Sequence, residues 1–199
     1  MRNRYTVVDT NPSHFWREVA DILGGTFATL EQSQRFGNYV YQLHTLQIVK
    51  PHRGINIELN SCFLMAPDIP NEFHLDDLRV ESFILNQVNF FLQLFPKGVY
   101  EKVFWFNKPR SGFKDFDRVI GFETNRMWEV RKFFANEAVR DLIQNDFYSQ
   151  FNIRYENETL IVKNQSNQVI LDKDVLLAAY AKFVLFVDGL IDAKLVKIS

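Results

Sequence analysis

FILNQVNFFLQLF, residues 83–95, is the stretch on which the predicted fold depends, together with the five residues before it. On a helix of about 3.6 residues per turn, its polar side chains fall in one row at spacings of three and four. Apolar side chains cover the rest of that helix, whereas an ordinary surface helix has a single apolar stripe. We therefore expect a central buried helix at about 78–95. Its polar row is Arg79, Ser82, Asn86, Asn89 and Gln93.

The composition is that of a soluble globular protein, with 199 residues of which 47% are hydrophobic and 24% charged. Eleven of the 20 Phe residues lie between residues 83 and 134, which predicts a phenylalanine-rich core. The net charge of −1 argues against a dedicated nucleic-acid binder, because such proteins carry a basic excess. A single cysteine excludes an intrachain disulfide. With neither a secretory signal nor a transmembrane segment in the sequence, we expect a cytoplasmic protein.

Turn and capping residues divide the rest of the chain into runs of strands and helices. Asn11 and Pro12 suit the start of a helix, and the glycines at 24–25 suit its end. The segment 54–66 alternates apolar and polar residues, which is typical of a strand with one covered face. The other predicted elements are strands at 26–34, 38–50, 99–106, 117–124, 151–155, 159–163 and 168–171, a helix at 125–146 broken near residue 136, and a helix at 173–193 capped by Asp172. In the helical stretch at 125–146, the side chains expected to point inward are Trp128, Phe134, Val139, Leu142 and Ile143.

This order, α-βββ-α-ββ-α(α)-βββ-α, predicts an α+β fold with four to five helices and a mixed or antiparallel sheet. We expect one compact domain over residues 1–199. The alternative is an internal duplication, in which two similar halves, 11–97 and 117–199, are joined by a hairpin. Sequence support for a duplication is weak, because two amphipathic helices match as well by chance.

The segment 102–116, KVFWFNKPRSGFKDF, interleaves aromatic side chains with cations and is the first candidate site. Aromatic faces beside cations can stack on bases, contact phosphates or lie at a membrane surface. The structural alternative is that Phe104 and Phe106 belong to the core and Trp105 covers an edge of the sheet. The residues expected to contact a ligand are Lys102, Trp105, Lys108, Arg110, Phe113 and Lys114.

The polar face of the hairpin at 38–66 is the second candidate. A turn centred on His52 would place Asn60 opposite His44. Cys62 would then be the diagonal neighbour of His44, with Glu58 on the same face. A thiol, an imidazole and a carboxylate are the ingredients of nucleophilic catalysis. However, a register slip of one residue would separate the two faces, and Cys62 lies at no helix N-terminus that would activate it.

Two weaker candidates follow from polar residues near the predicted central helix. The acidic run around His74, with Glu72, Asp76 and Asp77, contains metal-ligand types, but its aspartates suit a helix start and no second ligand has helical spacing. We therefore expect no metal site. The amide row of the central helix, Asn86, Asn89 and Gln93, would face solvent, a polar pocket or an oligomer seam.

The sequence contains none of the common nucleotide, hydrolase or zinc motifs, and no cofactor is expected. The leading hypothesis is a non-catalytic binding protein that contacts a partner protein or a phosphate-bearing ligand through 102–114. One alternative is an enzyme with scattered polar residues on the hairpin face at 38–66. The other is a homo-oligomeric structural protein, whose seam is the amide row or the pair of oppositely charged segments 68–81 and 102–132.

Overall fold

The computed structural model describes residues 13–36, 39–65, 73–75, 78–85, 87–98, 109–145, 149–166 and 172–198. Helices and strands alternate irregularly along this part of the chain, which confirms the α+β class. In chain order the elements are α1 (Ser13–Leu23), β1 (Thr26–Phe36), β2 (Tyr39–His52), β3 (Ile55–Met65), β4 (Phe73–Leu75), β5 (Leu78–Ile84), β6 (Leu92–Pro96), α3 (Lys114–Val119), β7 (Ile120–Thr124), α4 (Met127–Ala135), α5 (Glu137–Asn145), β8 (Ser149–Glu156), β9 (Thr159–Ser166) and α6 (Lys173–Asp192).

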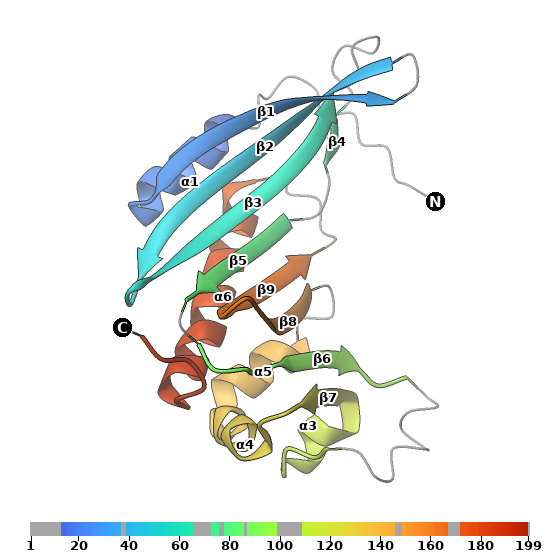
Figure 1. Ribbon diagram of the computed structural model, residues 1–199, viewed down its shortest axis with the longest axis vertical. Helices are drawn as coiled ribbons and strands as arrows, with labels where there is room; N and C mark the ends of the chain where they lie inside the picture. The colour runs from blue at the N-terminus through green and yellow to red at the C-terminus, as the bar shows by residue number, and fades with distance from the viewer. Residues whose placement is uncertain are drawn as a thin grey trace.

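The described strands form one antiparallel sheet in the order β1-β2-β3-β5-β9-β8-β6-β7, and β4 pairs with β3 beside this path (Figure 1). α1 packs on β1 and β2, α6 packs on β5, and the two helices contact each other on the same side of the sheet. The helix-covered side of the strands is buried, as at Ile57, Val80 and Val162. Arg79, Asn152 and other polar residues alternate with these positions and lie on the open face.

Local signals in the sequence predicted several of these elements well. Gly24 adopts the left-handed conformation (φ +63°) that ends α1. The Asp172 carboxylate accepts a hydrogen bond from the backbone N–H of Val175 and caps α6. The predicted break near residue 136 is also confirmed, because Asn136 ends α4 and its side chain accepts from the N–H of Ala138 at the start of α5.

The predicted central helix at 78–95 is wrong, because the stretch forms β5, an irregular segment and β6. Burial alternates along β5, where Leu78, Val80 and Ile84 face the helices and Arg79 and Phe83 face away. Two-residue alternation is the period of a strand. The two-residue period was not recognised in the sequence because most residues of 83–95 are apolar. The few polar residues are also compatible with the three- and four-residue spacing of a helix.

Because 78–95 is not a helix, Asn86, Asn89 and Gln93 do not form the predicted amide row. Asn86 lies outside the described residues. Asn89 is exposed in the irregular segment, and Gln93 is exposed on β6. No polar seam along one helix therefore joins these residues.

Two further interpretations of the middle of the chain are corrected. The strand predicted at 117–124 begins only at Ile120, because the residues before it form α3. Trp128, predicted to point inward from α4, is 75% exposed.

The strands predicted at 99–106 and 168–171 lie outside the described residues. The duplication is not confirmed, and the choice between one domain and two halves stays a prediction.

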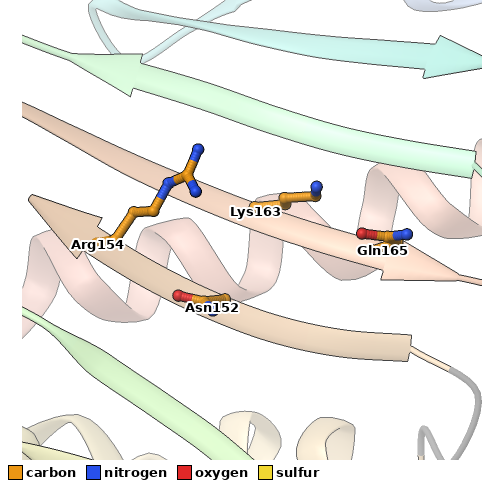
Figure 2. Close-up of a pocket in the computed structure, with 4 residues that line it drawn as sticks. All are labelled: Asn152, Arg154, Lys163 and Gln165. Carbon is orange, nitrogen blue, oxygen red and sulfur yellow. The ribbon is translucent and has the colours of Figure 1, made fainter. Parts of the chain in front are cut away.

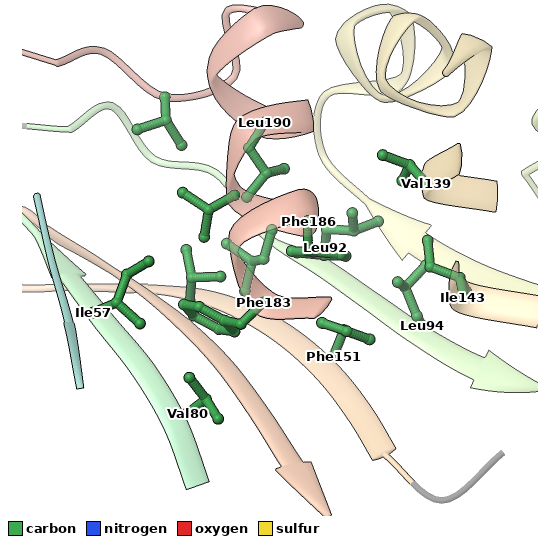
Figure 3. Packing of buried hydrophobic residues seen from close by; sticks show 14 of the residues in the cluster. Ile57, Val80, Leu92, Leu94, Val139, Ile143, Phe151, Phe183, Phe186 and Leu190 are labelled. Atoms are coloured by element: carbon green, nitrogen blue, oxygen red, sulfur yellow. The ribbon is translucent and has the colours of Figure 1, made fainter. Parts of the chain in front are cut away.

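Phenylalanine side chains fill the core between the sheet and the helices α3, α4 and α6, as the composition predicted (Figure 3). The Phe186 ring of α6 stacks on Phe151 of β8 with ring centroids 4.3 Å apart, and it meets the edge of Phe133 of α4 at 5.2 Å. Phe133 contacts Phe134, which in turn contacts Phe116 of α3 and Phe122 of β7. This chain of rings joins three helices to two strands.

Gly189 allows α6 to approach this aromatic core closely. A Cβ atom at position 189 would lie 2.8 Å from Val139 Cγ2 and 2.9 Å from Phe133 Cε2. Overpacking typically destabilises by about 1–3 kcal/mol, whereas alanine improves helix propensity by only about 1 kcal/mol. We therefore expect Gly189→Ala to lower the free energy of unfolding in urea. A more stable variant, as propensity alone predicts, would contradict the close packing.

The turn between β8 and β9 consists of Asn157 and Glu158, with φ of +48° and +62°. Positive φ at both positions is typical of a type I′ turn, which favours Asn-Gly. We expect Glu158→Gly to raise the free energy of unfolding by about 0.5–1 kcal/mol, since it removes left-handed strain from a non-glycine residue. Glu156→Gly, within the strand, is the matched control and should lower stability. The prediction fails if both variants lose stability equally.

Candidate functional site

The hairpin formed by β2 and β3 has a different register from the predicted one. Its turn is the pair Arg53 and Gly54, with φ of +47° and +84°, so His52 pairs with Ile55. This two-residue turn places His44 opposite Phe63 and Cys62 opposite Thr45. Residues directly opposite each other share a face. His44 and Cys62 therefore belong to opposite faces of the sheet, and the predicted register is wrong.

Glu58 lies on the open face and is partly buried in a network of polar side chains. Its carboxylate accepts a hydrogen bond from Gln47 Nε2 at 3.1 Å. Across the β3–β5 pairing Glu58 stands directly opposite Glu81, and like charges in this position repel. The Lys163 ammonium of β9 lies 3.6 Å from the Glu81 carboxylate and partly balances the charge.

Next to this network, the open face of β8 and β9 is hollowed (Figure 2). The hollow has a volume of about 130 Å³, and its described lining is Asn152, Arg154, Lys163 and Gln165. Figure 2 shows these side chains on the side of the strands away from the helix behind them. Cross-strand pairing places Asn152 directly opposite Lys163. The sequence held no signal for this site, because its residues are ordinary polar positions of two strands.

The basic and aromatic segment at 102–114 is described only from residue 109. Lys102, Trp105 and Lys108 lie outside the described residues, so their role stays a prediction. Arg110 and Lys114 are exposed. Phe113 is half-buried beneath the Arg140 guanidinium, which lies 3.9 Å from the ring centroid.

The described end of this segment is held rigidly against α3. Asp117 accepts hydrogen bonds from the backbone N–H of Ser111 at 2.9 Å and of Gly112 at 3.2 Å. Lys97 Nζ donates to the Asp117 carbonyl at 2.6 Å, and burial lowers the pKa of this lysine. These bonds fix the backbone beside Arg110, so its position is set by the fold.

Arg131 of α4 connects the segment to the exposed Trp128. Its Nε donates to the carbonyl oxygen of Arg110 at 3.3 Å, and its guanidinium lies 5.8 Å from the centroid of the Trp128 ring. A cation at this distance is attracted by the face of an indole. We call the four exposed residues Arg110, Lys114, Trp128 and Arg131 the basic–aromatic surface. Sequence reasoning missed Trp128, because the apolar pattern of its helix suggested that it points inward.

Exposed apolar side chains also lie close to the start of α4. Asn125, three residues before Trp128, binds the irregular segment between β5 and β6: its Oδ1 accepts from the Phe91 N–H at 3.1 Å, and its Nδ2 donates to the Asn89 carbonyl at 3.3 Å. Phe91 and Val88 of this segment are 39% and 49% exposed. The end of the molecule that carries Trp128 therefore presents further apolar surface.

A cluster that the sequence did not reveal joins the β2–β3 turn to α6. His52 Nε2 lies 2.8 Å from Asp188 Oδ1, and Arg53 reaches both Asp188 and Asp192. These hydrogen bonds raise the pKa of Arg53. The partners are more than 130 residues apart in the chain, so no local motif marks them. Their contacts hold the hairpin on the helix.

Metal binding and membrane spanning can be assessed for the described part of the chain. No group of three or more His, Cys, Asp or Glu side chains in it is arranged to hold a metal ion. The acidic residues predicted around His74, namely Glu72, Asp76 and Asp77, all lie outside the described residues. None of its helices has the length and apolar character needed to span a bilayer.

The corrected register predicts that His44 does not activate the thiol of Cys62. If His44 belongs to the other face of the sheet, removing it should not change how fast the thiol reacts. We expect wild type and His44→Ala to react with a neutral disulfide reagent at the same rate as each other at every pH between 6 and 9. A rate that is raised in wild type and lost in His44→Ala would support the catalytic alternative instead.

Comparison with known proteins identifies no relative. No protein-family model, no curated protein and no solved structure matches this chain. Its function must therefore be inferred from the geometry of its own residues.

Proposed function

We propose that this protein is a binding protein, and that a partner protein docks on the basic–aromatic surface. The observation that carries the proposal is Trp128, which is 75% exposed on a helix whose apolar residues Val130, Phe133 and Phe134 are buried. Tryptophan is enriched at protein interfaces and among the residues that dominate their binding energies.

Arg131 supports this role because it restricts the indole before a partner arrives. The Arg131 side chain is bound to the Arg110 carbonyl and lies over the Trp128 ring. A side chain that is already ordered loses less conformational entropy on binding than a free one. Trp128 and Arg131 together therefore resemble a preorganised anchor. The hydrogen bond from Arg131 to the backbone of the 109–113 segment holds the two side chains in place.

The charges of the surface favour a partner with acidic groups around an apolar pocket. Arg110, Lys114 and Arg131 are all exposed, and exposed charges contribute mainly to the rate and specificity of association. A bare phosphate group would use these cations but would leave the indole uncovered. The presence of Trp128 among them is the reason for preferring a protein.

Binding should depend on Trp128 much more than on a neighbouring charge. We expect Trp128→Ala to weaken capture of the partner by at least tenfold, since truncating an anchor residue commonly removes about 2 kcal/mol of binding free energy. Arg131→Gln should have a smaller effect that grows at low salt. The measurement is quantitative mass spectrometry of proteins retained from a lysate of the source organism by each immobilised variant.

Lys132→Gln is the matched control, because Lys132 is exposed on the same helix next to Arg131. It should retain the same proteins as wild type. All variants should keep the wild-type unfolding temperature, since the changed side chains are exposed. Equal retention by wild type and Trp128→Ala would refute the proposal. Light scattering of the purified protein identifies the case in which the partner is a second copy.

A further inference from the structure

We propose that the hollow on the open face of β8 and β9 binds a small oxyanion, a carboxylate or a phosphate group. The site is separate from the basic–aromatic surface and does not depend on it. Its described lining consists of two cations and two carboxamides, Arg154, Lys163, Asn152 and Gln165, from two adjacent strands (Figure 2).

Pairing of the two strands brings these four groups together. Asn152 is directly opposite Lys163, and Arg154 and Gln165 take the two diagonal positions on either side. Diagonal neighbours on one face are within reach of long side chains. Two cations in this arrangement repel each other, and an anion between them relieves the repulsion.

The hydrogen-bonding chemistry of the lining also favours an anion. Arginine and lysine are donors only, and a carboxamide can present its NH₂ group. The arginine fork matches the two oxygens of a carboxylate or phosphate. No carboxylate is part of the described lining. With a volume of about 130 Å³, the hollow is about ten times larger than the roughly 10–15 Å³ that one water needs by the same measure.

The neighbouring acids hold the two cations only loosely. Arg154 Nε is 3.3 Å from Glu156, and Lys163 Nζ is 3.6 Å from Glu81. Both distances exceed those of strong charge-assisted hydrogen bonds, which are about 2.7–2.9 Å. Arg154 and Glu156 are both more than half exposed, and such pairs contribute little to stability. An anion can therefore recruit the cations without disrupting the sheet.

Asn152→Asp is the sharpest test, because it keeps the shape of the side chain and places a negative charge in the hollow. The new carboxylate would stand opposite Lys163, so the variant should be at least as stable as wild type. The measurement is a series of ¹H–¹⁵N correlation spectra at constant ionic strength, with sodium phosphate, sodium acetate or sodium chloride as the titrant.

We expect the backbone amides of β8 and β9 to shift saturably with phosphate or acetate and not with chloride. Saturation by phosphate alone identifies a phosphate-type ligand, and saturation by acetate alone a carboxylate. Asn152→Asp should weaken the apparent affinity at least tenfold, and Arg154→Gln should weaken it several-fold. Because Arg154 is exposed, the second variant should fold normally.

Asn56→Asp is the matched control, since it makes the same charge change at an exposed position of β3, separated from β8 by β5 and β9. Screening at physiological salt acts over about 8 Å, so this control should bind like wild type. Equal weakening by both aspartate variants would show general electrostatics and refute the site. Shifts that never saturate, that are the same with chloride, or that persist in Asn152→Asp would also overturn it.

Discussion

The antiparallel pairing of β5 with β9 is the interaction on which the rest of the structure depends. It joins Leu78–Ile84 to Leu160–Ser166 along the whole of β5. The strands before β5 form one half of the sheet, and β8, β6 and β7 continue it on the other side of β9. Without this ladder, the N-terminal strands and the C-terminal hairpin would be two separate sheets. The pairing also creates the buried face on which α6 packs.

The two faces of this sheet have different physical roles. The covered face excludes water through interlocking phenylalanine rings and through Gly189, which lets α6 approach them closely. The open face carries charged and amide side chains that balance one another across strands, as Lys163 does with Glu81. Polar groups on an uncovered face remain available to ligands, whereas the helices shield those on the covered face. This asymmetry explains why the hollow lies on the open face.

The exposed position of Trp128 is determined by the contacts of the residues around it. Its neighbours on α4, Val130, Phe133 and Phe134, are all buried, and the helix begins where Asn125 binds the irregular segment before β6. The orientation of α4 is set by these contacts, and it leaves the indole outside. Arg131 then connects the ring to the segment at 109–113. The surface thus combines two parts of the chain, the segment at 110–114 and α4, that no sequence motif links.

Local sequence signals determined those elements whose residues decide their own conformation. Gly24, Asn136 and Asp172 mark helix ends through backbone geometry and capping, and the alternation of β3 marks its buried side. Tertiary structure decided the stretch at 83–95, because its apolar residues suit a helix or a strand equally and only pairing with β9 and β8 selects the strand. It also decided the β2–β3 register through a left-handed turn at Arg53 and Gly54. Contacts between residues distant in the chain, such as His52 with Asp188, leave no local pattern to find.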